Sequence, residues 1–120
     1  MPNNKAQMSN QAQNLNGKKK YDLEERTAQF GEAIIEFVKT LPKDPVNSQL
    51  ISQIIRSGTS VGANYMEADG AESKKDFQHK ISICKKESKE TKHWLRMMVR
   101  ANPNRRDEYQ KLASEAHSFA

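Results

Sequence analysis

The chain is short of the residues and patterns that mark several classes of protein. Its 120 residues include one cysteine, Cys84, which excludes a disulfide framework and is typical of a reducing compartment. No apolar run approaches the roughly 18 residues that a membrane-spanning helix needs. The first 13 residues lack the apolar core of a signal peptide. These absences favour a cytoplasmic location.

Motifs that carry catalysis or hold a cofactor are also missing. There is no glycine-rich phosphate loop, nucleophile elbow or paired-histidine zinc motif. His79 and His93 are fourteen residues apart on one predicted helix, roughly 21 Å, so they cannot share a metal ion, and His117 stands alone. Cys84 falls on the apolar side of its predicted helix, which favours a core residue over a nucleophile. We therefore expect no enzyme activity, metal or cofactor. A catalytic triad built from residues far apart in the sequence leaves no local spacing pattern and stays open at this point.

The positive charge is unevenly distributed. The net charge is +5, but residues 1–20 hold four lysines and no acid, so the remaining 100 residues are close to neutral. Residues 1–20 are rich in Asn, Gln, Ser and Lys and have too few large apolar groups to offset the entropy of ordering, which predicts a disordered tail. Within residues 21–120, the segment 73–101 holds nine basic and three acidic side chains, a net charge of +6.

Residues 21–120 carry helical periodicity in four segments and no strand-like alternation. In the first segment, about residues 21–41, steps of four and three separate Leu23, Thr27, Phe30, Ile34, Phe37 and Leu41. The other segments span about residues 45–69, 74–101 and 104–119. The connections are short, which favours antiparallel neighbours. The pattern predicts an all-α fold: an up-down, antiparallel four-helix bundle with a short fourth helix.

Capping residues predict where these helices begin and end. Asp44 before Pro45 is a good N-cap, and Ser73 with Asp76 resembles a capping box. Gly70 is predicted to end the second helix in a left-handed conformation, as many C-terminal glycines do. Asn104, with Asp107 three residues on, is predicted to open the fourth helix.

Residues 53–70, QIIRSGTSVGANYMEADG, carry side chains of interest on two faces of the second predicted helix. One face is apolar, and its residues recur at steps of three and four: Leu50, Ile54, Gly58, Val61, Tyr65 and Ala68. Arg56, Ser60 and Glu67 fall on a second, ionic line. Gly58 and Gly62 each cost about 1 kcal/mol relative to alanine, which predicts a close approach of another helix.

Lys80 and Glu87, seven residues apart, fall on or beside the apolar side of the third predicted helix. With Arg56, Ser60 and Glu67 they form a charged constellation that has two interpretations. One is a cleft with perturbed pKa values that performs acid–base chemistry. The other is a structural ionic network between the second and third helices, or between subunits. We favour the structural network, because partners of opposite sign are available and such networks fix helix register.

A second constellation, here called the basic stripe, runs along the third predicted helix. Steps of four, three, four and four separate Lys85, Lys89, Lys92, Arg96 and Arg100. The stripe spans roughly 22 Å, comparable to several phosphate spacings, and is predicted to face solvent. It is either a solvated helix face or a nucleic-acid-binding surface. No aromatic residue interleaves with it except Trp94, which the helical angle places elsewhere, so backbone contact is favoured over base stacking.

The chain closely resembles the bacterial four-helix-bundle family named after 23S rRNA intervening sequences in two stretches, IRSGTSVGANYMEA and, after Asp69 and Gly70, AESKKDFQHKISICKKESKETKHWL. The matching positions are Arg56, Ser57, Ser60, Gly62, Asn64, Glu67, Ser73, Asp76, Phe77, Lys80, Glu87, Glu90, Thr91 and Trp94. The resemblance covers about residues 21–119 and implies an up-down four-helix bundle that assembles as a homopentamer. Similar accessory proteins of diversity-generating retroelements bind nucleic acid and a reverse transcriptase. The chain departs from the family pattern in its long polar tail and short fourth helix.

Two hypotheses for function follow. The first is a non-enzymatic, homo-oligomeric bundle that binds the backbone of RNA or DNA through the basic stripe. The alternative is a protein–protein scaffold, an accessory ring for a larger enzyme such as a reverse transcriptase. Neither involves a membrane, and both expect self-association, with a pentamer as the form that the resemblance implies.

Overall fold

The computed structural model describes the backbone of residues 11–120 and the side chains from residue 23 onward. Residues 1–10 of the predicted tail lie outside the described residues. The first helix, α1, spans Gln11–Lys39 and so begins about ten residues before the position that the apolar pattern indicated. Residues 11–20 lack proline and contain Gln, Lys, Ala and Leu, which are good helix formers, so a helix can continue there without an apolar seam. The division of the chain at residue 20 stays a prediction.

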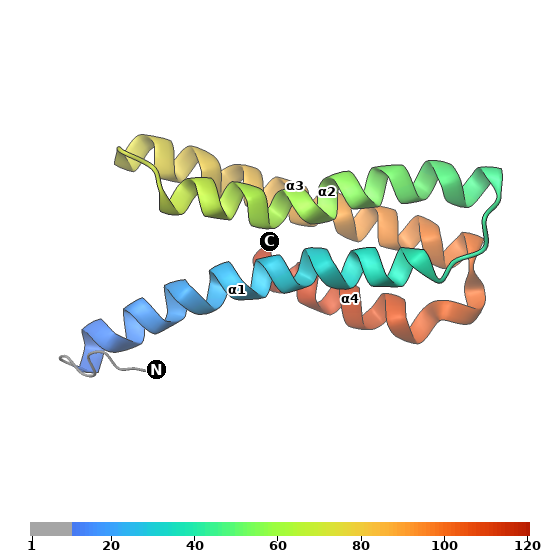
Figure 1. Cartoon of the computed structure of the whole chain (residues 1–120), viewed down its shortest axis with the longest axis horizontal. Helices are drawn as coiled ribbons and strands as arrows, with labels where there is room; N and C mark the ends of the chain where they lie inside the picture. The colour runs from blue at the N-terminus through green and yellow to red at the C-terminus, as the bar shows by residue number, and fades with distance from the viewer. Residues whose placement is uncertain (1–10) are drawn as a thin grey trace.

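Three further helices complete an all-α bundle. They are α2 (Pro45–Asp69), α3 (Lys74–Ala101) and α4 (Arg106–Phe119), and a 3₁₀ turn, η1 (Pro103–Arg105), precedes α4. Each helix packs against the next, and α1 also packs against α4, which closes the bundle (Figure 1). The described part of the chain contains no strand. The predicted up-down, antiparallel four-helix bundle with a short fourth helix is confirmed.

The caps explain two of the helix starts. The Asp44 carboxylate accepts a hydrogen bond from the Asn47 backbone N–H at 2.8 Å, and the Ser73 hydroxyl accepts one from the Asp76 N–H at 3.0 Å. Each bond satisfies a donor that a helix N-terminus leaves free. Both predicted starts are therefore correct.

Helix α2 ends at Asp69 with Gly70 as its cap, as predicted, but the predicted conformation of Gly70 and the predicted cap of α4 are wrong. Gly70 has φ −94°, so it is not left-handed, and its N–H donates to the Met66 carbonyl at 3.3 Å. A residue with a side chain can adopt this conformation, so the glycine is not required there for its freedom. Asn104 does not cap α4, because η1 occupies that position and α4 begins at Arg106 without a side-chain cap.

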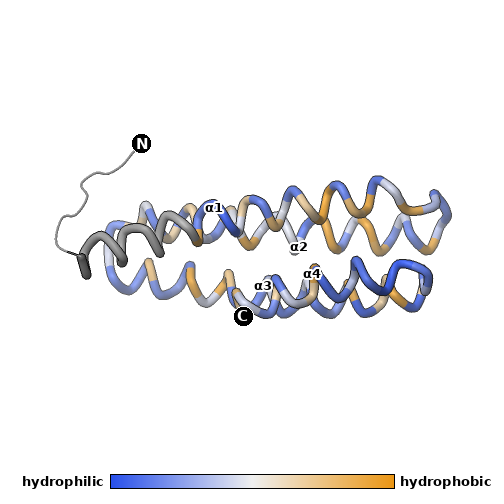
Figure 2. Tube along the Cα trace, turned by 90° about the horizontal axis from the view of Figure 1, so that it is seen from below, coloured by the Kyte–Doolittle hydropathy of each residue, from blue (hydrophilic) through white to orange (hydrophobic). Residues whose placement is uncertain are grey.

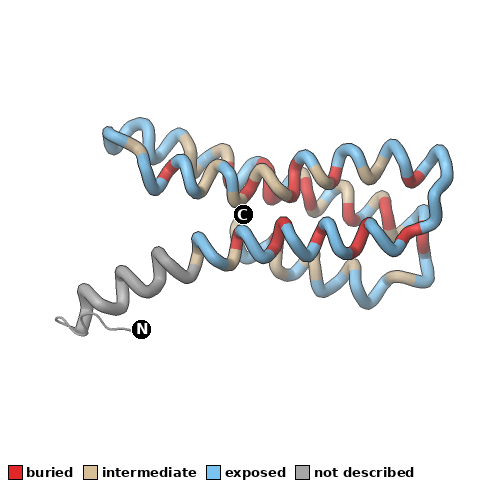
Figure 3. The backbone as a smooth tube through the Cα atoms, viewed as in Figure 1, coloured by how far each residue is buried: buried red, intermediate tan, exposed pale blue. Residues whose placement is uncertain are grey.

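The core lies where the four apolar faces meet (Figure 3). Its fully or almost fully buried members come from all four helices: Phe30, Ile34, Phe37, Val38, Leu41, Ile54, Val61, Leu95, Met98 and Ala116. Hydrophilic residues alternate with the apolar ones along the described helices, as amphipathic packing requires (Figure 2). Of the predicted apolar face of α2, Ile54, Gly58, Val61 and Ala68 are buried.

The glycines of α2 allow α1 to approach closely. A Cβ added at Gly58 would lie 3.1 Å from a side-chain carbon of Ile34. A Cβ added at Gly62 would lie 3.2 Å from the Thr27 carbonyl oxygen, a backbone atom that cannot move away by changing rotamer. The predicted close approach is confirmed, and the neighbouring helix is α1.

Two buried amide side chains form a hydrogen-bonded pair at the end of the bundle that contains the α1–α2 loop. Asn102 Nδ2 donates to Asn47 Oδ1 at 2.9 Å, and Asn47 Nδ2 donates to Asn102 Oδ1 at 3.1 Å. Asn47 also donates to the Pro42 carbonyl, and Asn102 to the Met98 carbonyl. Because both side chains are buried and satisfied, the pair fixes the α1–α2 loop against the end of α3.

Helix α4 covers only part of the bundle. It runs back from η1 and ends near the middle of the long axis, well short of the α2–α3 turn (Figure 1). Phe77, one of the positions that carry the family resemblance, is 41% exposed. Its position in the first turn of α3 lies beyond the reach of α4, which explains the exposure.

Candidate functional site

The basic stripe lies on the outer side of α3. Lys85, Lys89, Arg96 and Arg100 are exposed. None of these four side chains forms a hydrogen bond or ion pair with another described residue. The stripe therefore presents cations to solvent along most of its length, as its helical spacing indicated.

Lys92, the middle member of the stripe, differs from the other four. It is half-buried, and its Nζ lies 3.0 Å from Nδ1 of His117 in the last turn of α4. An ammonium has only donors, so Nδ1 must be the acceptor and the neutral imidazole carries its proton on Nε2. This contact places α4 beside the stripe. Sequence spacing treated His117 as an isolated surface residue and did not find it.

On the opposite flank of α3, which faces α2, two carboxylates meet an arginine of α2. Arg56 Nη1 donates to Glu87 Oε1 at 3.2 Å, and Arg56 Nη2 donates to Glu90 Oε2. Trp94 Nε1 donates to the same Glu90 oxygen at 3.0 Å. The Arg56 side chain is 47% exposed, and that of Glu87 is only 12% exposed. We call Arg56, Glu87, Glu90 and Trp94 the arginine cluster.

The arginine cluster shifts the pKa of two of its members. The hydrogen bond from Trp94 lowers the pKa of Glu90, and Arg56 lowers it further. The hydrogen bond to Glu90 raises the pKa of Arg56. Both shifts favour the charged forms, so the cluster is a stable ion pair rather than a proton donor or acceptor poised near neutral pH.

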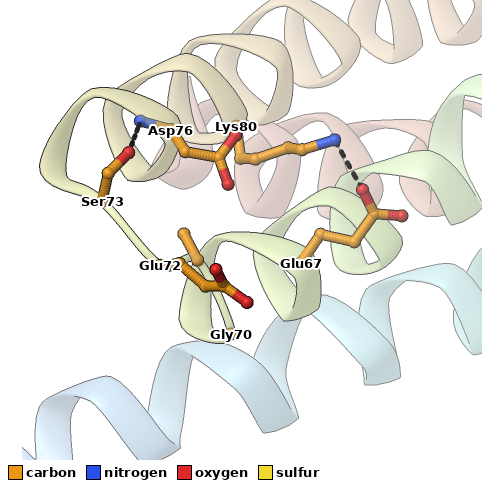
Figure 4. Close-up of a pocket in the computed structure, with 7 residues that line it drawn as sticks. Glu67, Gly70, Glu72, Ser73, Asp76 and Lys80 are labelled. Carbon is orange, nitrogen blue, oxygen red and sulfur yellow. Dashed lines mark hydrogen bonds and ion pairs between the residues drawn. The ribbon is translucent and has the colours of Figure 1, made fainter.

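Lys80 and Glu67 form a separate ion pair near the α2–α3 turn. Lys80 Nζ donates to Glu67 Oε1 at 2.7 Å, and this bond raises the pKa of Lys80 (Figure 4). The pair lies at one side of an open hollow that is also lined by Gly70, Ala71, Glu72, Ser73 and Asp76. Three carboxylates and one ammonium line the hollow, which disfavours a phosphate ligand there.

The five residues predicted to form one ionic network thus lie in two separate places. Arg56 pairs with Glu87, and Lys80 pairs with Glu67, both across the α2–α3 interface. Ser60 joins neither pair, because its hydroxyl donates to the Arg56 backbone carbonyl at 2.6 Å. Sequence reasoning did not assign Glu90 and Trp94 to the network. They follow Glu87 at steps of three and seven, which is the spacing of one helix flank and could have identified them.

Buried hydroxyl groups lie between the two flanks. Thr91 Oγ1 is within hydrogen-bonding distance of Ser57 Oγ, at 2.9 Å, and of the Glu87 carbonyl, at 2.8 Å. Cys84 Sγ donates to the Val61 carbonyl at 3.4 Å, and burial raises the pKa of its thiol to about 11. A thiol with that pKa is protonated at neutral pH, so its predicted role as a core residue agrees with its surroundings.

The described residues offer no metal site and no membrane span. No three His, Cys, Asp or Glu side chains among them are grouped closely enough to hold a metal ion. None of the helices, over the part that the structure describes, has the length and apolarity to cross a membrane. His79 and His93 are both exposed.

Comparisons with known proteins agree with the fold. The family model described as 23S rRNA-intervening sequence protein matches residues 19–120. The chain is also similar to a crystal structure of a protein of unknown function from the S23 ribosomal protein family of Bacteroides thetaiotaomicron VPI-5482. The identity is 34%, the TM-score is 0.71, and the match covers 81% of this chain and 90% of the other. None of the curated proteins compared with the chain matches it. Since the family model covers nearly the whole chain, the protein belongs to the family of 23S rRNA-intervening sequence proteins.

Proposed function

We propose that the protein is a non-enzymatic, homo-oligomeric helical bundle that binds the backbone of nucleic acid through the basic stripe of α3. The observation that carries this proposal is the difference between the stripe and the charged positions of α3 that face α2. Lys85, Lys89, Arg96 and Arg100 are exposed without a side-chain partner among the described residues, whereas Lys80 and Glu87 are paired. A row of unpaired cations on a rigid helix is suited to phosphates.

The composition of the stripe favours the backbone over the bases. Base recognition in single strands needs exposed aromatic side chains on which bases stack. Trp94, the aromatic residue nearest in sequence to the middle of the stripe, lies on the opposite flank and donates its N–H to Glu90. Binding is therefore expected to depend on salt and to vary little with sequence.

The family supports RNA as the first ligand to test. The family model is named after 23S rRNA intervening sequences, and the similar crystal structure is assigned to a ribosomal protein family. Neither description states a binding activity. They guide the choice of probe, and the stripe supplies the physical reason.

The proposed self-association uses the outer side of the α2–α3 pair. Ile83, Trp94 and Met97 are half-buried on the flank of α3 that also carries Glu90. With the half-exposed Arg56, they form a mixed apolar and ionic surface of the kind found at the core of subunit interfaces. The resemblance implies a closed ring of five, which would repeat the basic stripe on every subunit. Multi-angle light scattering that finds a stable monomer at micromolar concentration would contradict this part of the proposal.

The decisive experiment measures binding of a labelled RNA duplex as a function of salt, by fluorescence anisotropy. The triple variant Lys85→Gln, Lys89→Gln and Arg96→Gln removes three phosphate contacts. It should flatten the slope of log affinity against log salt by roughly 3 and weaken binding at every sequence tested. The matched control changes Lys43, Lys74 and Lys111 to Gln, which alters the net charge equally at exposed positions outside the stripe.

Two outcomes would overturn the proposal. If the stripe variant and the matched control lose affinity equally, the effect is one of net charge and the stripe is not a site. If the wild-type protein binds only weakly and a protein partner co-purifies from the native host, the accessory-scaffold alternative is supported instead.

A further inference from the structure

Helix α4 packs against α1 and α3, and its charged side chains differ between the two sides. On the side toward α1, Glu115 accepts hydrogen bonds from Arg26, both at 3.3 Å. Glu108, seven residues earlier on the same line, pairs with Arg105. The acids on this line are therefore neutralised within the chain, on the side of α4 that faces away from the basic stripe.

The side of α4 toward α3 carries no acid. Arg106, Gln110, Ala113 and His117 recur there at steps of four, three and four, which is one line of a helix. His117 touches Lys92 of the stripe, so this line borders the stripe. Arg106, Gln110 and His117 are exposed, and neither Arg106 nor Gln110 has a side-chain partner among the described residues. The remaining acid, Asp107, lies in the first turn of α4, outside the line.

We propose that Arg106, Gln110 and His117 form a second row of phosphate-binding side chains beside the basic stripe, and that the Lys92–His117 contact makes binding pH-dependent. This inference rests on the proposed function. Axes of packed helices lie about 8–10 Å apart, so two rows on adjacent helices can contact phosphates that one row cannot reach. The ligand that fits two parallel rows is a duplex, which presents phosphates on both sides of a groove.

The pH dependence follows from the hydrogen bond between Lys92 and His117. A neutral imidazole accepts at Nδ1 from the Lys92 ammonium. A protonated imidazole, the form that acid favours, has donors on both nitrogens, cannot accept, and repels the ammonium. Both groups then become available to a phosphate, so the binding face gains cationic contacts as the pH falls.

Other charged side chains lie on the two helices that pack against α4. On α3, Lys89 and Arg96 lie one turn before and after Lys92. On α1, Arg26 is held by Glu115 and by the Ser118 hydroxyl, at 2.8 Å. A phosphate bound beside these side chains attracts the protonated imidazole more strongly than the neutral one. Binding should consequently take up a proton.

The experiment compares the affinity of the full chain for a labelled RNA duplex at about pH 8 and about pH 5.5, at constant ionic strength. The wild-type affinity should rise roughly 3–10-fold as the pH falls, with a steeper salt slope at the lower pH. His117→Gln cannot gain a proton and should lose most of this rise. His117→Arg, which is charged throughout, should bind tightly at both pH values.

His79→Gln is the matched control, because His79 is exposed on the first half of α3 and far from α4. It should keep the wild-type pH dependence. If His117→Gln keeps that dependence as well, the inference is overturned while the proposed function stands. If no variant and no wild-type protein binds the duplex at either pH, the proposed function itself is overturned, and this inference with it.

Discussion

Helix α3 carries charged side chains on both of its flanks, but those on the flank that faces α2 form ion pairs, whereas most of those on the other flank have no partner among the described residues. On the flank that faces α2, Glu87 and Glu90 meet Arg56, and Lys80 meets Glu67. On the other flank four cations of the basic stripe have no partner among the described residues. Like charges at helical spacing destabilise a helix by roughly 0.2–0.5 kcal/mol per pair, so the stripe does not contribute to stability. The comparison separates residues that hold the fold from residues that are available to a ligand.

The largest expected effect comes from reversing the charge of the unpaired flank. The change of Lys85, Lys89 and Arg96 to Glu should lower the affinity for an RNA duplex roughly 100-fold or more, because three attractive contacts become repulsive. The free energy of unfolding should stay within about 0.5 kcal/mol of wild type, because the three side chains are exposed and have no hydrogen-bond or ion-pair partner among the described residues. Anisotropy and urea denaturation measure the two quantities. A large loss of stability would show that the stripe belongs to the folded core instead.

Removing the arginine of α2 that pairs with the other flank of α3 should instead lower the stability of the fold. Arg56→Ala leaves the Glu87 carboxylate, only 12% exposed, and Glu90 without their cation. We expect a loss of about 1–2 kcal/mol in the free energy of unfolding, less than for a fully buried pair because the arginine is half exposed to solvent. Arg96→Ala is the control and should cost less than about 0.5 kcal/mol. Equal losses in the two variants, measured by urea denaturation, would remove the distinction between the flanks.

The hydroxyl groups between the flanks should contribute less. Thr91→Val removes the hydroxyl that contacts Ser57 Oγ and the Glu87 carbonyl, so a buried serine loses a partner. The expected loss is about 1 kcal/mol. Thr59→Val is the matched control, because the Thr59 hydroxyl contacts only the Ile55 carbonyl of its own helix, and it should cost less than about 0.5 kcal/mol. If thermal unfolding shows no difference between the two, the Ser57 contact contributes nothing.

The helices were predictable from the sequence to different degrees. The apolar residues that recur from Phe30 to Leu41 predicted the buried face of α1, and the caps at Asp44 and Ser73 predicted where α2 and α3 begin. The structure agrees with each of these predictions. The start of α1 was misplaced, because residues 11–20 are helical without an apolar pattern to mark them. The left-handed conformation predicted for Gly70 was also wrong, since a glycine at a helix C-terminus permits a left-handed turn but does not impose one.

The candidate site was predictable only where one helix contains it. The basic stripe lies on α3 alone, so helical spacing placed its members on one face. The arginine cluster and the Lys92–His117 contact each join two helices. Which residue of α2 lies beside Glu87 depends on the axial offset between the helices. That offset is set by packing across the whole interface, and not by the spacing within either helix.

The smallest expected effect concerns the pH dependence of the paired flank. The hydrogen bond from Trp94, and then Arg56, lower the pKa of Glu90 in the folded state. In the unfolded chain a glutamate titrates near its ordinary pKa of about 4.3. The unfolded state therefore binds more protons between the two pKa values. The stabilisation from Glu90 is complete above the unfolded-state value and is lost as the pH falls through the folded-state value.

Glu90→Gln lacks this titration, so it tests the paired flank directly. The difference in unfolding free energy between wild type and Glu90→Gln should be largest near pH 6 and should shrink as the pH falls toward about 3. It should remain below about 1 kcal/mol, because the Glu90 side chain is partly exposed. Glu72→Gln is the control, because it removes one carboxylate at an exposed position without a side-chain partner among the described residues. If the Glu90→Gln difference does not change with pH, Arg56 and Trp94 do not hold a carboxylate in solution, and the two flanks of α3 are energetically alike.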